Sequence, residues 1–123
     1  MNTPLRILIV DDSPLDAELL VLTLKRLGYA LSWTVTDNAA GLTAALAERP
    51  EIVFTDCNMG QFDARDVLEL VRAQAPAVPV VVVSGSANED DLRQQGATDF
   101  LLKDRLAEIG TVVERVFGRA KRP

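Results

Sequence analysis

Hydrophobic residues fall into two alternating patterns along the chain. Five apolar or β-branched runs have the length of a strand and are too short for a helix. They are 6–10 (RILIV), 31–36 (LSWTVT), 52–55 (IVFT), 78–83 (VPVVVV) and 100–102 (FLL). Between these runs, apolar residues recur at the three- and four-residue spacing of a helix face. The pattern predicts five strands that alternate with helices.

The first helix has clear boundary signals. Ser13 is a favourable N-cap residue, Pro14 suits the first helical position, and Gly28 is typical of a helix end. One face of this helix carries three leucines, Leu15, Leu19 and Leu22. The spacing predicts a helix that begins after Ser13 and ends near Gly28.

Acidic N-cap candidates place the second and third helices. Asp37 is a good N-cap for a helix that runs through Ala47, and Pro50 separates this helix from the strand at 52–55. A third helix is expected over 63–74. Its inward face is formed by Val67, Leu68 and Val71.

The last third of the chain contains shorter helical segments. A short helix is expected over 88–95, ended by Gly96. A separate helical turn is expected over 104–109, because Gly110 interrupts the pattern there. The final helix starts at Thr111 and has an apolar face formed by Val112, Val113, Val116 and Phe117.

Strands that alternate with helices form a parallel sheet covered on both faces, with right-handed crossovers. We therefore expect a single α/β domain over 1–123, a three-layer sandwich with the flavodoxin-like strand order 2-1-3-4-5. The β-branched run at 78–83 fits a strand that is buried on both faces. This order places a topological switch point between strands 1 and 3, where ligands bind at the carboxyl ends of strands.

Polar side chains end four of the predicted strands. Asp11 and Asp12 follow the first strand, Asp56 the third, Ser84 the fourth and Lys103 the fifth. In the order 2-1-3-4-5 these ends share one edge, so three carboxylates, a hydroxyl and an ammonium are expected to converge. Clustered carboxylates repel one another unless a cation compensates, and oxygen ligands suit Mg²⁺, with Mn²⁺ as an alternative. An aspartate can be phosphorylated, and phosphoryl transfer needs positioning and charge neutralisation, so this set favours phosphoryl chemistry.

Length and composition exclude several classes of function. A length of 123 residues is enough for one domain. The net charge of −5 argues against direct binding to nucleic acid. No apolar run reaches the ~18 residues of a membrane span, so we expect a cytoplasmic protein. The absence of histidine excludes histidine-based triads, histidine metal sites and a phosphohistidine carrier. A single cysteine, Cys57, allows no internal disulfide.

Four motifs occur in a fixed order on this five-unit pattern. They are the acid pair at 11–12, the segment IVFTD-x-N-M at 52–59, VVVSG at 81–85 and LLK at 101–103. Together they make the chain resemble a response-regulator receiver domain of two-component signalling over almost its whole length. The KDRL sequence at 103–106 is similar to a receiver subgroup found as single domains or beside sensor-kinase and nucleotide-signalling modules.

The resemblance implies a phosphorylation switch. Asp56 would accept a phosphoryl group from a sensor histidine kinase or a phosphotransfer protein. Lys103 would bind that group, Ser84 would move to donate a hydrogen bond to it, and the ring of Phe100 would turn inward on activation. The implied metal site binds Mg²⁺ through the side chains of Asp11, Asp12 and Asp56 and the backbone carbonyl of Asn58. No enzymatic activity is implied beyond self-catalysed phosphoryl uptake and loss.

The chain departs from the family pattern in three places. Gly60 and Asp104 stand where proline is usual. The segment between Ser84 and Lys103 is about three residues short, which removes nearly one turn of helix 4 at ~3.6 residues per turn. In the family, helix 4, strand 5 and helix 5 form the output surface. That surface would act on a downstream protein whose identity the sequence does not reveal, and a homodimer through it remains an open option.

Several alternatives remain open on the sequence alone. Asp11 and Asp12 could cap the first helix, Ser84 could be a turn residue, and Phe100 and Trp33 could be packing residues. The alternative function is a pseudo-receiver, a protein-interaction module that is never phosphorylated. A phosphatase of the haloacid-dehalogenase type would need a second acid at position 58, where this chain has asparagine. A flavodoxin-like cofactor protein would need a phosphate-cradling loop in place of the acid pair.

Overall fold

The structure is a computed structural model that describes residues 4–57, 62–85 and 96–121, with side chains up to Phe117. The strands in this part of the chain are β1 Leu5–Val10, β2 Leu31–Thr36, β3 Ile52–Asp56, β4 Val80–Ser84 and β5 Asp99–Leu102. The helices are α1 Pro14–Arg26, α2 Ala39–Leu46, α3 Ala64–Gln74, the 3-10 helix η1 Lys103–Glu108 and α5 Ile109–Lys121. The helix expected over 88–95 lies outside the described residues. None of the described helices is long and apolar enough to cross a membrane.

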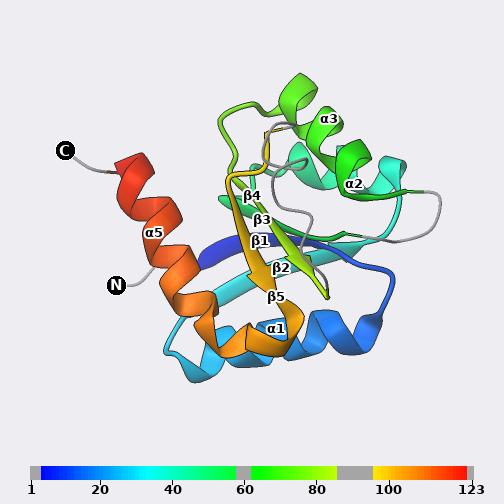
Figure 1. Cartoon of the computed structure of the whole chain (residues 1–123). Coiled ribbons are helices and arrows are strands. Elements are labelled where there is room, and N and C mark those ends of the chain that lie inside the picture. The colour runs from blue at the N-terminus through cyan, green and yellow to red at the C-terminus, as the bar shows by residue number, and fades with distance from the viewer. Residues whose placement is uncertain (1–3, 58–61, 86–95, 122–123) are drawn as a thin grey trace.

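All five strands lie parallel in one sheet, in the order β2-β1-β3-β4-β5, which confirms the predicted topology. α1 and α5 cover one face of the sheet, and α2 and α3 cover the other (Figure 1). Side chains alternate between the two faces of a strand. On β1, therefore, Ile7 and Ile9 pack toward α1 and α5, whereas Leu8 and Val10 pack toward α2 and α3.

The apolar runs at the centre of the sequence form the buried strands. Every residue of β3 and of β4 is buried, as expected for parallel strands covered on both faces. On α3, the predicted inward residues Val67, Leu68 and Val71 are each at most 3% exposed. These strands and helices hold the carboxyl edge of the sheet in a defined position.

The buried face of α1 differs from the row of leucines that marks the sequence. Ala17, Leu20, Val21 and Leu24 pack on the sheet, whereas Leu15, Leu19 and Leu22 are 66%, 46% and 39% exposed. Apolar residues surround most of this helix, so helical periodicity alone does not select the inward face. Contact with β1 and β2 decides the rotation of α1 about its axis.

The N-caps follow the predicted chemistry with one shift in position. Ser13 Oγ accepts a hydrogen bond from Asp16 N–H at 3.3 Å, and Pro14 occupies the first turn of α1. For α2 the N-cap is Asn38 rather than Asp37, because Asn38 Oδ1 is the group that accepts from Gly41 N–H, at 2.8 Å. α2 also ends at Leu46, one residue earlier than expected.

The start of the last helix also differs from the prediction. The helical turn expected over 104–109 is the 3-10 helix η1, and α5 begins at Ile109 rather than Thr111. Gly110 therefore lies inside α5 and does not interrupt it. Ile109 is fully buried, so its side chain anchors the first turn of α5 in the core.

Trp33 packs at the surface of the protein and not in the core. β2 lies at the edge of the sheet, and Trp33 is 43% exposed. The Lys25 ammonium lies 4.6 Å from the centroid of the Trp33 ring, a cation–π arrangement between α1 and β2. The indole therefore covers a surface between these elements.

We expect Gly41→Ala to destabilise the protein, although alanine is the better helix former. A Cβ at position 41 would lie 2.9 Å from Thr36 Cβ and would overlap Thr36 Oγ1. The free energy of unfolding should fall by about 1–3 kcal/mol, the usual cost of overpacking, instead of rising by ~1 kcal/mol. Urea denaturation measures the difference. The exposed Ala40→Gly exchange is the control for propensity alone, and a stabilised Gly41→Ala variant would contradict the close approach.

Candidate functional site

β1 ends in two acids with different environments. Asp11 is 8% exposed, and its Oδ1 accepts a hydrogen bond from Ser13 N–H at 2.9 Å. The chain segment that begins α1 therefore fixes this carboxylate. Asp12, the next residue, is exposed. One acid is held at the edge of the core, and the other is open to solvent.

β3 places a third acid at the same edge of the sheet. Ile52, Val53 and Phe54 are fully buried, and Asp56, the last residue of the strand, is 9% exposed. Asp56 Oδ1 accepts a hydrogen bond from Cys57 N–H at 2.8 Å. The apolar strand thus leads into the core and ends with a carboxylate whose orientation is set by the backbone.

The three acids form one cluster, as the strand order predicts. β1 and β3 are neighbours, with Val10 beside Thr55, so the residues that follow meet at the end of the sheet. One carboxylate oxygen from each of Asp11, Asp12 and Asp56 lies within 4.8 Å of the others. The roles expected for these residues remain predictions.

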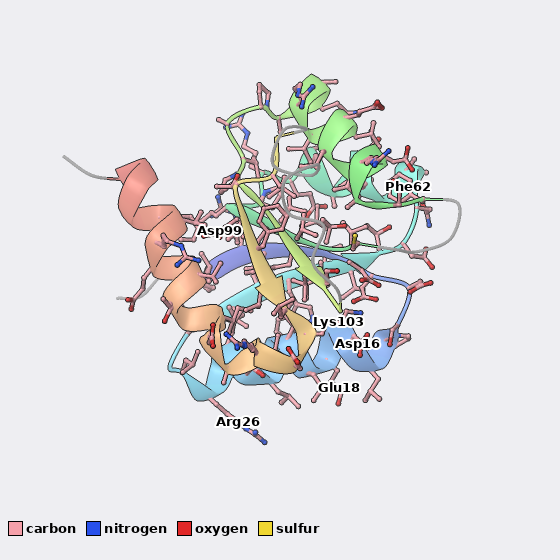
Figure 2. All side chains as sticks on the ribbon, in the orientation of Figure 1. Asp16, Glu18, Arg26, Phe62, Asp99 and Lys103 are labelled. Carbon is pink, nitrogen blue, oxygen red and sulfur yellow. The ribbon has the colours of Figure 1, made fainter. Side chains whose placement is uncertain are left out.

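A lysine that is distant in the sequence neutralises part of the negative charge of the three acids. Lys103 follows β5, and its Nζ lies 3.3 Å from Asp56 Oδ1. The same Nζ donates a hydrogen bond to Asp16 Oδ2 at 2.9 Å. Figure 2 shows Lys103 and Asp16 close together where β5 ends and α1 begins. The ammonium therefore connects two carboxylates.

Asp16 is the site residue that sequence reasoning missed. It lies in the first turn of α1, where an acid is common because it interacts favourably with the helix dipole. Its contact with Lys103 joins residues 87 positions apart, so no local pattern reports it. The feature that could have identified Asp16 as a site residue is its position in the sequence. It follows the acid pair by one helical turn, at the same rim.

The other predicted site residues occupy different environments. Ser84 ends β4 and is 7% exposed, next to Val83, which pairs with Asp56. Phe100 on β5 is partly buried and packs on the core that faces α2 and α3. Asn58 lies outside the described residues. The contribution of each to phosphorylation stays a prediction.

Burial and neighbouring charges shift the pKa of two groups at this rim. Burial raises the pKa of Asp11, and the charge of Asp56 adds to this effect, against the hydrogen bond from Ser13 N–H. Burial lowers the pKa of Lys103, but the hydrogen bond to Asp16 and the charges of Asp56 and Asp11 outweigh it, so the pKa is raised. The folded protein therefore resists ionisation of Asp11 and favours the ammonium form of Lys103.

The donor set fits a hard divalent cation. Three carboxylates and one ammonium leave the rim negatively charged, and all the clustered donors are oxygens. Mg²⁺ prefers oxygen ligands, is held by few carboxylates and retains water molecules that a phosphoryl oxygen can replace. Asp11, Asp12 and Asp56 would hold such an ion, and Lys103 would remain beside Asp56.

Comparison with known proteins gives consistent matches. The family model of the response regulator receiver domain matches residues 7–114. The probable transcriptional regulatory protein TcrX of Mycobacterium tuberculosis is 30% identical over 103 residues, which are 81% of this chain and 44% of that protein. The chain spans between 24% and 53% of the length of the first curated relatives that it matches.

Two solved receiver domains share the fold. The signal receiver domain of a signal transduction histidine kinase from Syntrophus aciditrophicus has a TM-score of 0.78 and 26% identity, covering 96% of this chain and 93% of that chain. The receiver domain of a sensor histidine kinase from Pseudomonas aeruginosa PAO1 has a TM-score of 0.74 and 26% identity, covering 94% and 99%. That structure holds a magnesium ion in its active site cleft.

We expect Asp11→Asn to stabilise the metal-free protein. The pKa of Asp11 is raised from 3.8, so its ionisation lowers the free energy of unfolding as the pH rises above that value. Asparagine keeps an oxygen for Ser13 N–H and carries no charge. The melting temperature at neutral pH should rise by a few degrees in chelator, and the gain should shrink as the pH falls toward 3.8.

In saturating Mg²⁺ the wild-type protein should become more stable than Asp11→Asn, because only the wild-type protein gains full stabilisation from the ion. The exposed Asp12→Asn is the matched control: it should lose the Mg²⁺ effect while changing the metal-free melting temperature less. Equal melting temperatures for wild type and Asp11→Asn under both conditions would show that the Asp11 charge neither destabilises the metal-free protein nor binds the ion.

Asp16→Asn should weaken Mg²⁺ binding without unfolding the protein. Removing this charge leaves the Lys103 ammonium less compensated and more repulsive to a cation beside Asp56. We expect a loss of about three- to tenfold in affinity, the size of a Coulomb interaction of ~1 kcal/mol, measured by calorimetric titration. Glu18→Gln, an exposed acid on the same helix, is the control. An unchanged affinity in Asp16→Asn would show that Asp16 does not act on the site.

Proposed function

The chain belongs to the response regulator receiver domain family, and we propose that Asp56 is the phosphoryl acceptor of a two-component signalling switch. One observation supports the proposal most directly. Asp56, at the end of a buried strand, is in contact with the Lys103 ammonium and shares a cluster with Asp11 and Asp12. Two-component receivers work by phosphorylation, and this arrangement supplies the nucleophile, the counter-charge and the ligands that phosphoryl transfer needs.

The Asp56 carboxylate is the attacking group in the proposed reaction. Its Oδ1 is oriented by Cys57 N–H and by Lys103, so we assign the attack to Oδ2. A bond forms between this oxygen and phosphorus, and the phosphorus–nitrogen bond of a phosphohistidine donor breaks. The electron pair of that bond returns to the imidazole nitrogen, which leaves as the neutral or protonated ring. The product is an acyl phosphate on Asp56.

Charge neutralisation at the rim governs the rate of this step. Asp11, Asp12 and Asp56 would hold Mg²⁺, together with the backbone carbonyl of Asn58, and the ion would neutralise charge on the transferring phosphoryl oxygens. Lys103 supplies a second positive charge beside Asp56. Since it already contacts Asp56, it can follow the new phosphoryl oxygen with little movement.

The phosphoryl group would bias a two-state change near β4 and β5. Ser84 ends β4 as a buried hydroxyl, and a hydrogen bond to a phosphoryl oxygen would draw this segment toward Asp56. Phe100 would then turn inward on the neighbouring strand. A new group that binds one conformation better shifts the population toward it, and the surface around β5 and α5 would change for a downstream partner.

The proposed input is a sensor histidine kinase or a phosphotransfer protein. Such a partner must bring its phosphoryl group to the rim, and α1 begins there. Leu15 and Leu19 are large exposed hydrophobic residues on the first turns of α1, near Asp16. An apolar face beside a charged site suits protein docking, so we assign these leucines to contact with the phosphodonor.

Beryllofluoride, a mimic of an acyl phosphate, tests the proposed function. Wild-type protein should bind it in a Mg²⁺-dependent manner, and ¹⁹F NMR should detect the bound species. Asp56→Asn should abolish the signal because the acceptor oxygen is no longer anionic. Asp37→Asn, an exposed acid outside the cluster, should retain it. A wild-type protein that shows no bound fluoride with Mg²⁺ present would refute phosphorylation and favour an interaction module.

A further inference from the structure

The large exposed hydrophobic side chains of the described residues belong to neighbouring elements. They lie on α1, on the turn that follows it and on β2: Leu15, Leu19, Leu22, Leu27, Trp33 and Val35, each at least 39% exposed. α1 and β2 pack against each other in the tertiary structure. Of these residues, Leu22, Trp33 and Val35 line one groove between α1 and β2. Exposed apolar side chains grouped in this way are typical of an interaction site.

β2 is the part of this surface with an open backbone edge. Within the described ranges it pairs with β1 alone, and its register with β1 is continuous. Its sequence LSWTVT contains neither a charge nor a proline, and residues 32–35 are all exposed. Proteins usually protect an edge strand with a charge, a proline or a bulge. β2 is therefore an unprotected edge.

The hydrogen bonds to β1 decide which backbone groups face outward. The carbonyl oxygen of Ala30 accepts from Leu5 N–H at 2.8 Å. The carbonyl oxygen of Thr36 accepts from Asp11 N–H at 3.0 Å. Even-numbered residues therefore direct their backbone groups toward β1. Because this direction alternates along a strand, the free donors and acceptors belong to the odd-numbered residues Leu31, Trp33 and Val35.

A second copy of β2 complements this edge in the antiparallel direction. With Trp33 opposite Trp33, the outward backbone groups of both strands meet as hydrogen-bonded pairs. Leu31 then lies opposite Val35 on the apolar face, and Ser32 lies opposite Thr34 on the polar face. Aromatic pairs, apolar pairs and hydroxyl pairs across strands each add stability. The strand is self-complementary in this register.

The charged residues beside β2 in one copy also complement those in a second copy. A groove of about 590 Å³ lies between α1 and β2 and is lined by Trp33 and Val35. Asp12 and Asp37 line it at the carboxyl end of β2, whereas Lys25 lines it near the other end, at the last turn of α1. A two-fold axis through Trp33 would bring the basic end of each groove toward the acidic end of its partner.

We propose that β2 is a self-association edge, through which two copies of the chain pair antiparallel about a two-fold axis at Trp33. The two five-stranded sheets become one continuous sheet, with both α1 helices on the same face and the grooves facing each other. A contact between two six-residue strands is smaller than a standard stable interface, so the dimer is reversible and forms at roughly micromolar to millimolar concentration. This inference does not depend on phosphorylation of Asp56.

Sedimentation equilibrium over a concentration series tests the proposal with the full chain. The wild type should dimerise, and its sole tryptophan should report the event as a blue shift in emission. Val35→Pro removes an outward N–H while leaving the bonds to β1, and Val35→Lys adds a charge to the edge. Each should raise the dissociation constant by about tenfold or more. Thermal melting of both variants confirms that they are folded.

Leu19→Lys is the matched control, because it adds the same charge to an exposed apolar position on α1 away from β2. Retention of the dimer in Leu19→Lys and its loss in both Val35 variants would support the edge. A wild type that stays monomeric to millimolar concentration would overturn it. A dimer that survives both Val35 variants, or one lost only in Leu19→Lys, would also overturn it by locating the contact elsewhere.

Discussion

Mutual repulsion of three carboxylates within 4.8 Å of one another is the constraint on which the rest of this structure depends. Asp11 and Asp56 are almost withdrawn from water, so solvent screens their repulsion poorly. The buried strands β1 and β3 hold both acids in place, because moving either one would expose apolar side chains. Lys103 offsets one charge and leaves the rim in need of a further cation. Without a further cation, this cluster of carboxylates is unfavourable. With a cation bound, the same cluster makes the rim suitable for a phosphoryl group.

α1 connects this rim with the open edge of the sheet. Its first turn carries Asp16, which holds the Lys103 ammonium, and its last turn carries Lys25, which lies over Trp33. Asp11 and Asp12 belong both to the acidic cluster and to the lining of the groove beside β2. Any change in charge at the rim therefore alters the electrostatic field along the groove. This shared position gives the proposed phosphoacceptor site a physical route to the surface where a second copy would bind.

Much of the fold was predictable because hydrophobic pattern and turn chemistry act locally. The strand order, the Ser13 cap and the inward face of α3 follow from such patterns and are confirmed. The predictions were wrong where a sequence pattern is compatible with two different structures. Adjacent Asp37 and Asn38 can both cap a helix, and only the path of the chain after β2 selects Asn38. The apolar residues of α1 likewise fit more than one rotation of the helix.

The sequence by itself determined which residues end the strands, and so which chemistry could meet at one edge: Asp11, Asp12, Asp56, Ser84 and Lys103. The strand order predicted from the alternation of strands and helices was sufficient to bring these residues together, because parallel strands present all their carboxyl ends at the same side of the sheet. Only the tertiary structure decided that Asp16 shares the lysine and that Trp33 is exposed on an open edge. Both depend on contacts between distant segments and on which strand lies at the margin of the sheet. Such contacts arise from the packing of whole elements and leave no periodic trace in the chain.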